Sequence, residues 1–153
     1  MSTSRWLKIT QADLIDHKVA ALVEQLQAAA LGEDQDDPTP GMIRRVIDRV
    51  RLKVASCKDN RVDADPETIP AGLKDQVLDL IIYALKNRLE LDLTKAEIDN
   101  RKIIEADLNA IAACRLSIDI PDTPVPAPVE SGGGAELISS SPRLASRRQT
   151  AGL

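Results

Sequence analysis

The chain has 153 residues, of which 29% are charged and 43% are hydrophobic, and its formal net charge is −4. This length and balance indicate one soluble globular domain, and the acidic total argues against a dedicated nucleic-acid-binding protein. Phe is absent and the only aromatic residues are Trp6 and Tyr83, so the core must be aliphatic, which favours packed helices over a sandwich of sheets. Neither a signal-peptide pattern nor a long apolar run occurs, and we therefore expect a protein that is made and kept in the cytosol.

The first expected helix begins after Thr10, which can cap it, with Asp13 three residues on in a capping-box position. Apolar residues then recur at helical spacing, with a break near Asp16 and His17. The segment 31–41 contains two prolines and four acidic residues, which predicts a loop that ends the helix.

Three further helices are expected. The second covers about 41–58, and its apolar residues fall on one stripe. The third, about 70–90, is apolar around most of its circumference, so it either lies at the centre of a bundle or turns one face to another subunit. The fourth, roughly 94–115, begins with a capping box formed by Thr94 and Glu97. The chain is therefore predicted to be all-α, with a small four-helix bundle.

The two cysteines, Cys57 and Cys114, both fall on apolar faces of expected helices. There they are expected to be small core residues in a reducing compartment. A disulfide between them is the alternative, but nothing in the sequence supports it. The absence of a CxxC pair gives no indication of metal or redox chemistry.

The fourth helix is followed by "RLSIDI", in which Leu116, Ile118 and Ile120 alternate with polar residues. Such alternation predicts a short C-terminal strand over 115–120. A single strand needs a partner, and no obvious partner strand occurs elsewhere in the sequence. A sheet edge supplied by a neighbouring copy of the chain is therefore the attractive interpretation.

From residue 121 the sequence is rich in Pro, Gly and Ser and loses its periodicity. This change divides the chain into a helical domain, 1–120, and a long extended arm, 121–153. The last fifteen residues are basic and contain no acid, and we expect them to dock on a neighbouring subunit or another partner. The residues expected to make this contact are Arg143, Leu144, Arg147 and Arg148. A disordered, solubilising tail is the alternative interpretation.

No catalytic constellation is visible in the sequence. His17 is the sole histidine, and a lone histidine is far more often a surface residue than a general base. No nucleophile elbow, phosphate-binding loop or zinc-binding pair of histidines occurs, and the acidic residues have no spacing that suggests a metal site. We therefore expect a protein that is not an enzyme and holds no cofactor or metal.

A basic row on the second helix, Arg45, Arg49 and Lys53, has the spacing i, i+4 and i+8. It is open to three interpretations: a solvated face, a surface that pairs with the acidic exterior of the fourth helix of another copy, or a phosphate-binding row. The last makes a small helical DNA-binding or regulatory protein the alternative function. A cytosolic helical adaptor whose tail is a linear motif is a third.

Several segments follow one another along the chain in an order that is similar to the order seen in one known family. They are "ITQADL", "CKDNR", "IPAGLKDQVLDLIIYALKNRLEL", "EADLNAIAACRLSID" and "SPRLASRRQTAGL". In this order they resemble the head–tail connector proteins (adaptor or head-completion proteins) of long-tailed bacteriophages, especially those of Mu-like phages and prophages.

The resemblance implies a small α-helical protein that forms a ring, commonly of twelve copies, beneath the portal protein at the capsid vertex. Such a ring lies in the neck of the virion, is assembled in the host cytoplasm, and extends the channel through which DNA passes without sequence-specific binding. It offers a platform to the tail or to a tail terminator or tail-completion protein. The family members are not enzymes, and their extended terminal segments reach neighbouring subunits or the portal. No membrane partner is implied.

Overall fold

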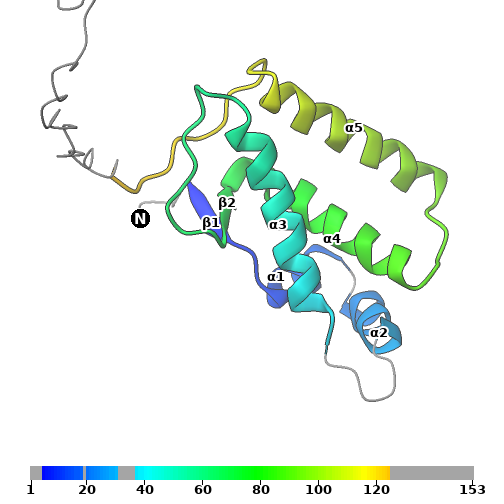
Figure 1. Ribbon diagram of the computed structural model, residues 1–153. Helices are drawn as coiled ribbons and strands as arrows, with labels where there is room; N and C mark the ends of the chain where they lie inside the picture. Colours follow the sequence, from blue (N-terminus) through cyan, green and yellow to red (C-terminus); the bar gives the residue numbers. More distant parts are fainter. Residues whose placement is uncertain (1–4, 19, 31–36, 125–153) are drawn as a thin grey trace, which may run out of the picture.

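The computed structural model describes residues 5–18, 20–30 and 37–124 of the chain (Figure 1). Within these residues the fold is mostly α-helical, with five α-helices, one short 3-10 helix and one two-stranded sheet. The elements in chain order are β1 (Trp6–Lys8), α1 (Gln11–His17), α2 (Ala20–Ala30), α3 (Thr39–Ala55), β2 (Thr68–Pro70), η1 (Ala71–Leu73), α4 (Lys74–Arg88) and α5 (Lys95–Ala112).

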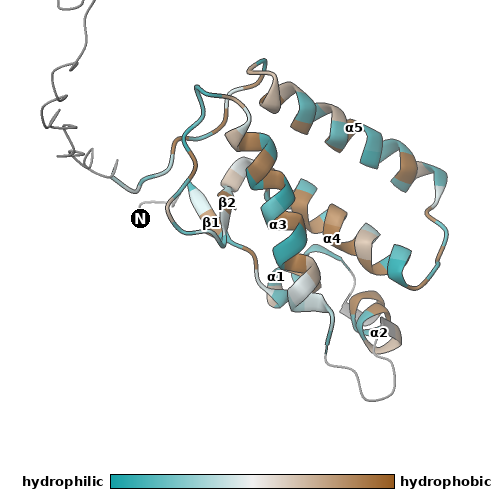
Figure 2. Ribbon diagram, viewed as in Figure 1, coloured by the Kyte–Doolittle hydropathy of each residue, from teal (hydrophilic) through white to brown (hydrophobic). Residues whose placement is uncertain are grey.

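The helix α4 lies at the centre of the fold. It packs against α1, α2, α3 and α5, and Figure 2 shows it mainly in the colours of hydrophobic residues. Its buried residues are Val77, Leu78, Leu80, Ile81, Ile82, Tyr83 and Leu85. Because an α-helix with apolar residues on nearly all sides must be covered on nearly all sides, the prediction of a third helix at the centre is confirmed.

The local signals for the first and fourth expected helices are also confirmed. The first is divided into α1 and α2, with Lys18 in extended backbone between them (φ −125°, ψ 169°). At the start of α1, the backbone N–H of Thr10 donates to the carboxylate of Asp13 at 2.8 Å. At the start of α5, the backbone N–H of Thr94 donates to Glu97 Oε2 at 2.9 Å, and the backbone N–H of Glu97 donates to Thr94 Oγ1 at 3.3 Å.

The sheet was not expected from the sequence. β1 and β2 pair antiparallel, with Trp6 opposite Pro70 and Lys8 opposite Thr68. Each strand has only three residues, too few for a period of two to stand out. The all-α prediction therefore needs this correction: the helices share the core with a small sheet, in which Trp6 and Ile69 are buried.

The predicted strand at 115–120 is wrong. These residues belong to an irregular segment, 115–124, that we call the strap, and it crosses the end of the molecule from α5 to β1 (Figure 1). Ile118 packs on the core, whereas Leu116 and Ile120 are 44% and 59% exposed. The alternation of apolar and polar residues thus occurs in an irregular segment, several of whose carbonyl oxygens accept hydrogen bonds from the side chains of Trp6 and Arg61 rather than from a second strand.

The two cysteines form a disulfide, which corrects the expectation of two core thiols. The bond joins Cys57, just after α3, to Cys114, just after α5, across 57 residues of sequence. Cys57 is buried and Cys114 is exposed, and the backbone of Cys114 is left-handed (φ 58°). The bond therefore fixes the root of the strap to the end of α3.

Candidate functional site

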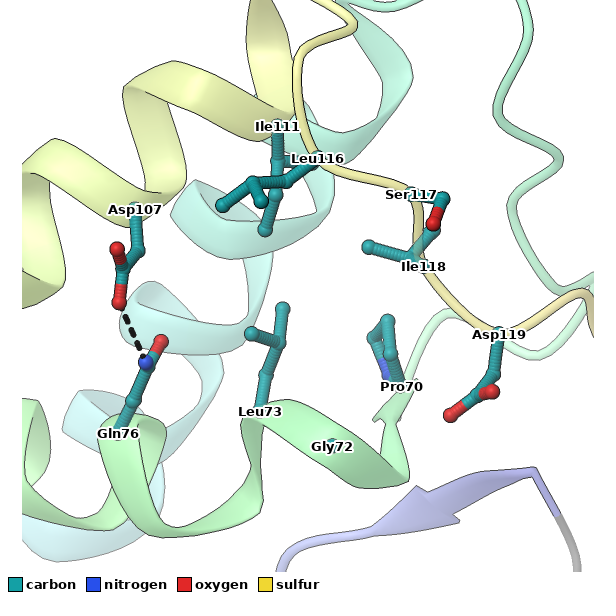
Figure 3. Close-up of a pocket in the computed structure, with 10 residues that line it drawn as sticks. All are labelled: Pro70, Gly72, Leu73, Gln76, Asp107, Ile111, Leu116, Ser117, Ile118 and Asp119. Atoms are coloured by element: carbon teal, nitrogen blue, oxygen red, sulfur yellow. Dashed lines mark hydrogen bonds between the residues drawn. The ribbon is translucent and has the colours of Figure 1, made fainter.

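A cavity of about 320 Å³ lies between η1, the C-terminal half of α5 and the strap. We call it the strap pocket. Its apolar lining consists of Pro70, Leu73, Ile111, Leu116 and Ile118. Figure 3 shows these side chains around the middle of the pocket, with Asp107 and Asp119 at opposite ends of the group.

Neighbouring elements fix the apolar lining of the strap pocket. Leu73 is buried at the end of η1, and Ile111 is buried on the inner stripe of α5. Ile118 is half-buried and packs on the core, whereas Leu116 is exposed. The pocket therefore has helical walls on one side and a wall of irregular backbone on the strap side.

The polar groups of the strap pocket are mainly acceptors. Gln76 Nε2 donates to Asp107 Oδ2 at 3.0 Å, which occupies one acceptor of that carboxylate. Gln76 Oε1 is buried and has no hydrogen-bond partner among the described residues. Within the same residues, no basic side chain forms an ion pair with Asp107 or Asp119. The pocket thus has unmet capacity for donors and cations around an apolar centre.

The strap is held near the sheet by its backbone. Trp6 Nε1 donates to the carbonyl oxygen of Asp119 at 2.8 Å, and Arg61 Nη2 donates to the carbonyl oxygen of Pro121 at 2.6 Å and to that of Thr123. The backbone N–H of Arg5 donates to the carboxylate of Asp122 at 2.9 Å. Ordered contacts therefore extend past the predicted domain boundary at residue 120.

Asp63, in the loop before β2, also holds the end of the strap. Its carboxylate accepts hydrogen bonds from the hydroxyls of Thr123 and Thr68. The bond from Thr123 is the main cause that lowers the pKa of Asp63, and it outweighs the opposing effect of burial. An ionised Asp63 thus fixes the end of the strap.

The basic row predicted on the second helix lies on α3, and two of its members contact α5 of the same chain. Arg49 Nη2 lies 2.6 Å from Glu105 Oε1, and Lys53 Nζ donates to Asn109 Oδ1 at 2.8 Å. Arg45 lines a different cavity beside Arg88. The three residues are exposed or half-exposed, but the row is not an uninterrupted cationic surface.

The sole histidine lies in a polar cluster between α1, α4 and α5. His17 Nε2 is 3.0 Å from Asp79 Oδ1, and Lys18 Nζ is 3.1 Å from the same oxygen. Asn100 Nδ2 donates to Asp79 Oδ2 and to the hydroxyl of Tyr83, each at 2.9 Å. Burial raises the pKa of Asp79, but these donors outweigh it and the pKa is lowered. The cluster therefore joins α1, α4 and α5 through the carboxylate of Asp79.

Cys57, Cys114 and Asp59 bring their sulfur and carboxylate atoms within 4.8 Å of one another. The thiolate is the form of cysteine that binds metal, and both sulfurs are engaged in the disulfide. In this bonded form the cluster is a covalent link between α3 and the strap.

Of the other residues predicted to form an interface, Leu116 and Ile118 line the strap pocket, and Ile120 lines an adjoining cavity that shares these two residues. Arg143, Leu144, Arg147 and Arg148 lie outside the described residues. Sequence reasoning missed Leu73, Gln76, Asp107 and Asp119, because only the fold brings η1, α5 and the strap together.

No helix in the described ranges is long and apolar enough to cross a membrane. Comparison with known proteins gives no relative: no family model, no curated protein and no solved structure matches the chain.

Proposed function

We propose that this protein is a structural subunit of a phage neck, which assembles into a ring between the capsid portal and the tail and acts by binding rather than by catalysis. The proposal includes the helical-bundle arrangement and the twelve-fold ring that the sequence resemblance implies. Its support is the ordered series of segments from "ITQADL" to "SPRLASRRQTAGL", together with the surface features of the described residues.

The observation that carries the proposal is the way in which the arm begins. The strap leads the chain across the end of the domain and is tied by Arg5 and Arg61 as far as Thr123. Residues 125–153 follow, and they contain no acid after Glu136. A basic arm that begins at a fixed point on a domain is suited to reach a second protein.

Exposed apolar residues on separate elements also favour assembly. Leu52 on α3 is 70% exposed, Ile103 on α5 is 59% exposed and Ile120 on the strap is 59% exposed. A closed ring is built from head-to-tail contacts, in which two different surfaces of each subunit meet. Exposed apolar residues on more than one element are consistent with such contacts.

The alternative, a DNA-binding protein that uses Arg45, Arg49 and Lys53, receives less support. Arg49 and Lys53 already contact α5, so phosphate would have to compete with Glu105 and Asn109. Retention of the monomer on DNA with a steep salt dependence would favour this alternative over the neck function.

The test is native mass spectrometry and negative-stain imaging of the full chain mixed with the portal protein from the same genome. We expect a ring stacked on the portal. A chain that ends at Pro124 keeps the strap contacts and removes only the arm, so we expect it to bind the portal more weakly. Leu144→Asp in the full chain changes the same region without shortening it. If none of the three forms gives a complex with the portal protein, the proposal is contradicted.

A further inference from the structure

We propose that the strap pocket binds residues 141–148 of a second copy of this chain, with Leu144 in the apolar centre and arginines of the segment against Asp107 and Asp119. The inference rests on the proposed function, because it names the contact by which one subunit of the ring holds its neighbour. The segment "SPRLASRR" lies outside the described residues, and its chemistry is taken from its sequence.

The first argument is the apolar centre. Leu73, Ile111, Leu116 and Ile118 surround a cavity of about 320 Å³, and a cavity of about 150 Å³ already holds a benzene molecule. The pocket therefore has room for the side chain of Leu144 and for part of the backbone beside it. Burial of one leucine side chain contributes favourably, because it removes apolar surface from water.

The second argument is the position of charge. Asp107 and Asp119 lie at opposite ends of the apolar centre (Figure 3), and no described cation pairs with either of them. In the segment, Arg143 precedes Leu144 and Arg147 follows it. One apolar residue with cations on both sides thus matches an apolar centre with acids on both sides, and arginine is well suited to pairing with carboxylates.

The third argument is selectivity among the cavities of the described residues. Three other cavities contain arginine: one has Arg101, one has Arg45 and Arg88, and one has Arg49 and Arg101. The one acid that lines these three cavities is Glu105, which already pairs with Arg49, so they offer little to attract a basic segment. The strap pocket contains no base, and neither does an adjoining cavity that is lined by Asp59 and Ile120 and shares four strap residues with it. Charge therefore favours the strap pocket and this adjoining cavity over the other three.

The fourth argument is reach. Residues 125–140 separate the last described residue from the docking segment, and a fully extended stretch of this length spans at most roughly 55 Å. This is about twice the length of α5, whose 18 residues rise about 27 Å. The segment can thus reach a neighbouring subunit. Because the pocket and the segment are different surfaces, each copy can give one contact and receive one, as a closed ring requires.

The experiment uses the full chain with p-benzoylphenylalanine in place of Ala145, next to the apolar anchor, and irradiation in the presence of the portal. We expect a covalently linked dimer in which digestion and mass spectrometry find the crosslink on residues 70–76 or 107–119. A crosslink only within one chain, or only on the portal, would overturn the inference.

Two matched variants make the result specific to the pocket. Gly72 lines the pocket, and a Cβ atom at this position would meet only Asp119 Oδ2, at 3.9 Å. Gly72→Arg places a bulky cation in the pocket, and we expect it to reduce the yield of crosslinked dimer roughly tenfold, as the loss of about 1.4 kcal/mol of binding would. Gly41→Arg adds the same charge on α3, where a Cβ atom meets nothing within 4 Å, and should leave the yield unchanged. Equal yields from the two variants would overturn the inference.

The imaging of rings on the portal separates this inference from the proposed function. If Gly72→Arg forms normal rings and no form of the protein gives the dimer crosslink, the assigned contact is ruled out. The neck function would still stand. Absence of rings and of portal binding in the unmodified chain would contradict the proposed function itself.

Discussion

The guanidinium group of Arg51 lies over the indole ring of Trp6, with its central carbon 5.5 Å from the ring centroid. The same group donates to the carbonyl oxygens of Thr68 and Asp63, each at 2.6 Å. One side chain on α3 therefore joins β1, β2 and the loop before β2. Burial lowers the pKa of Arg51, but an arginine stays protonated at neutral pH.

Replacement of Arg51 by Met should destabilise the fold. We expect a decrease of about 2–3 kcal/mol in the free energy of unfolding, because two hydrogen bonds from a charged group and a cation–π contact are lost. Arg51→Lys should recover only part of this, since lysine lacks the planar fork. Urea denaturation followed by circular dichroism measures the effect, with the exposed Arg44→Met as control. Equal stability of the two methionine variants would contradict the assignment.

Reduction of the disulfide should loosen the strap. We expect the free energy of unfolding to fall by about 2–4 kcal/mol, because the bond closes a long loop in the unfolded chain. Cys114→Ser should reproduce the loss without reductant. Native-state hydrogen exchange should then show faster exchange at 115–124 than in α4. Alkylation of two thiols in the freshly purified, unreduced protein would show that the bond is absent.

Acid should weaken the junction between α1 and α4. Burial acts to raise the pKa of Asp13, but the ion pair with Lys74 and the hydrogen bonds from Thr10 bring that pKa to about 2. Because the pKa in the folded state is below that of the unfolded state, the contribution is present above about pH 4 and is lost as the pH falls toward 2.

Asp13→Asn tests this contribution. We expect it to cost about 1 kcal/mol at pH 7 through the weakened capping box, and to reduce the dependence of the urea midpoint on pH between 4 and 2. Asp16→Asn, at an exposed position of the same helix, is the control. An unchanged pH dependence in the Asp13 variant would refute the assignment.

Asp79 should be a structural residue. Asp79→Ala leaves His17, Lys18 and Asn100 without their shared acceptor, and we expect a loss of about 2–3 kcal/mol of stability. Asp75, one turn earlier on α4, has a side chain that is 86% exposed. Asp75→Ala should therefore change stability by less than about 0.5 kcal/mol. Thermal unfolding of the two variants side by side decides the point.

Features that depend on neighbours in sequence could be predicted. The capping boxes at Thr10 and Thr94 are encoded within four residues, and the break after His17 lies where apolar spacing is interrupted. The central place of α4 follows from its apolar circumference, because exposure of such a surface is unfavourable.

Features that depend on segments far apart in the sequence could not be predicted. Cys57 and Cys114 are 57 residues apart, and no spacing rule predicts their contact. The spacing of Arg49 and Lys53 gave a row, but Glu105 and Asn109, which bind them, lie on another helix. For the same reason the strap pocket has no local signature: its walls come from η1, α5 and the strap.

The hydrogen bond between the backbone N–H of Arg5 and the carboxylate of Asp122 places the two ends of the folded region side by side. A bulky label attached at position 5 would therefore lie beside Asp122, where it competes sterically with whatever binds the strap. Labels for binding experiments are best placed away from this position. The same closeness makes the folded region, residues 5–124, suited to circular permutation, in which a short linker joins position 124 to position 5 and new ends open between α2 and α3.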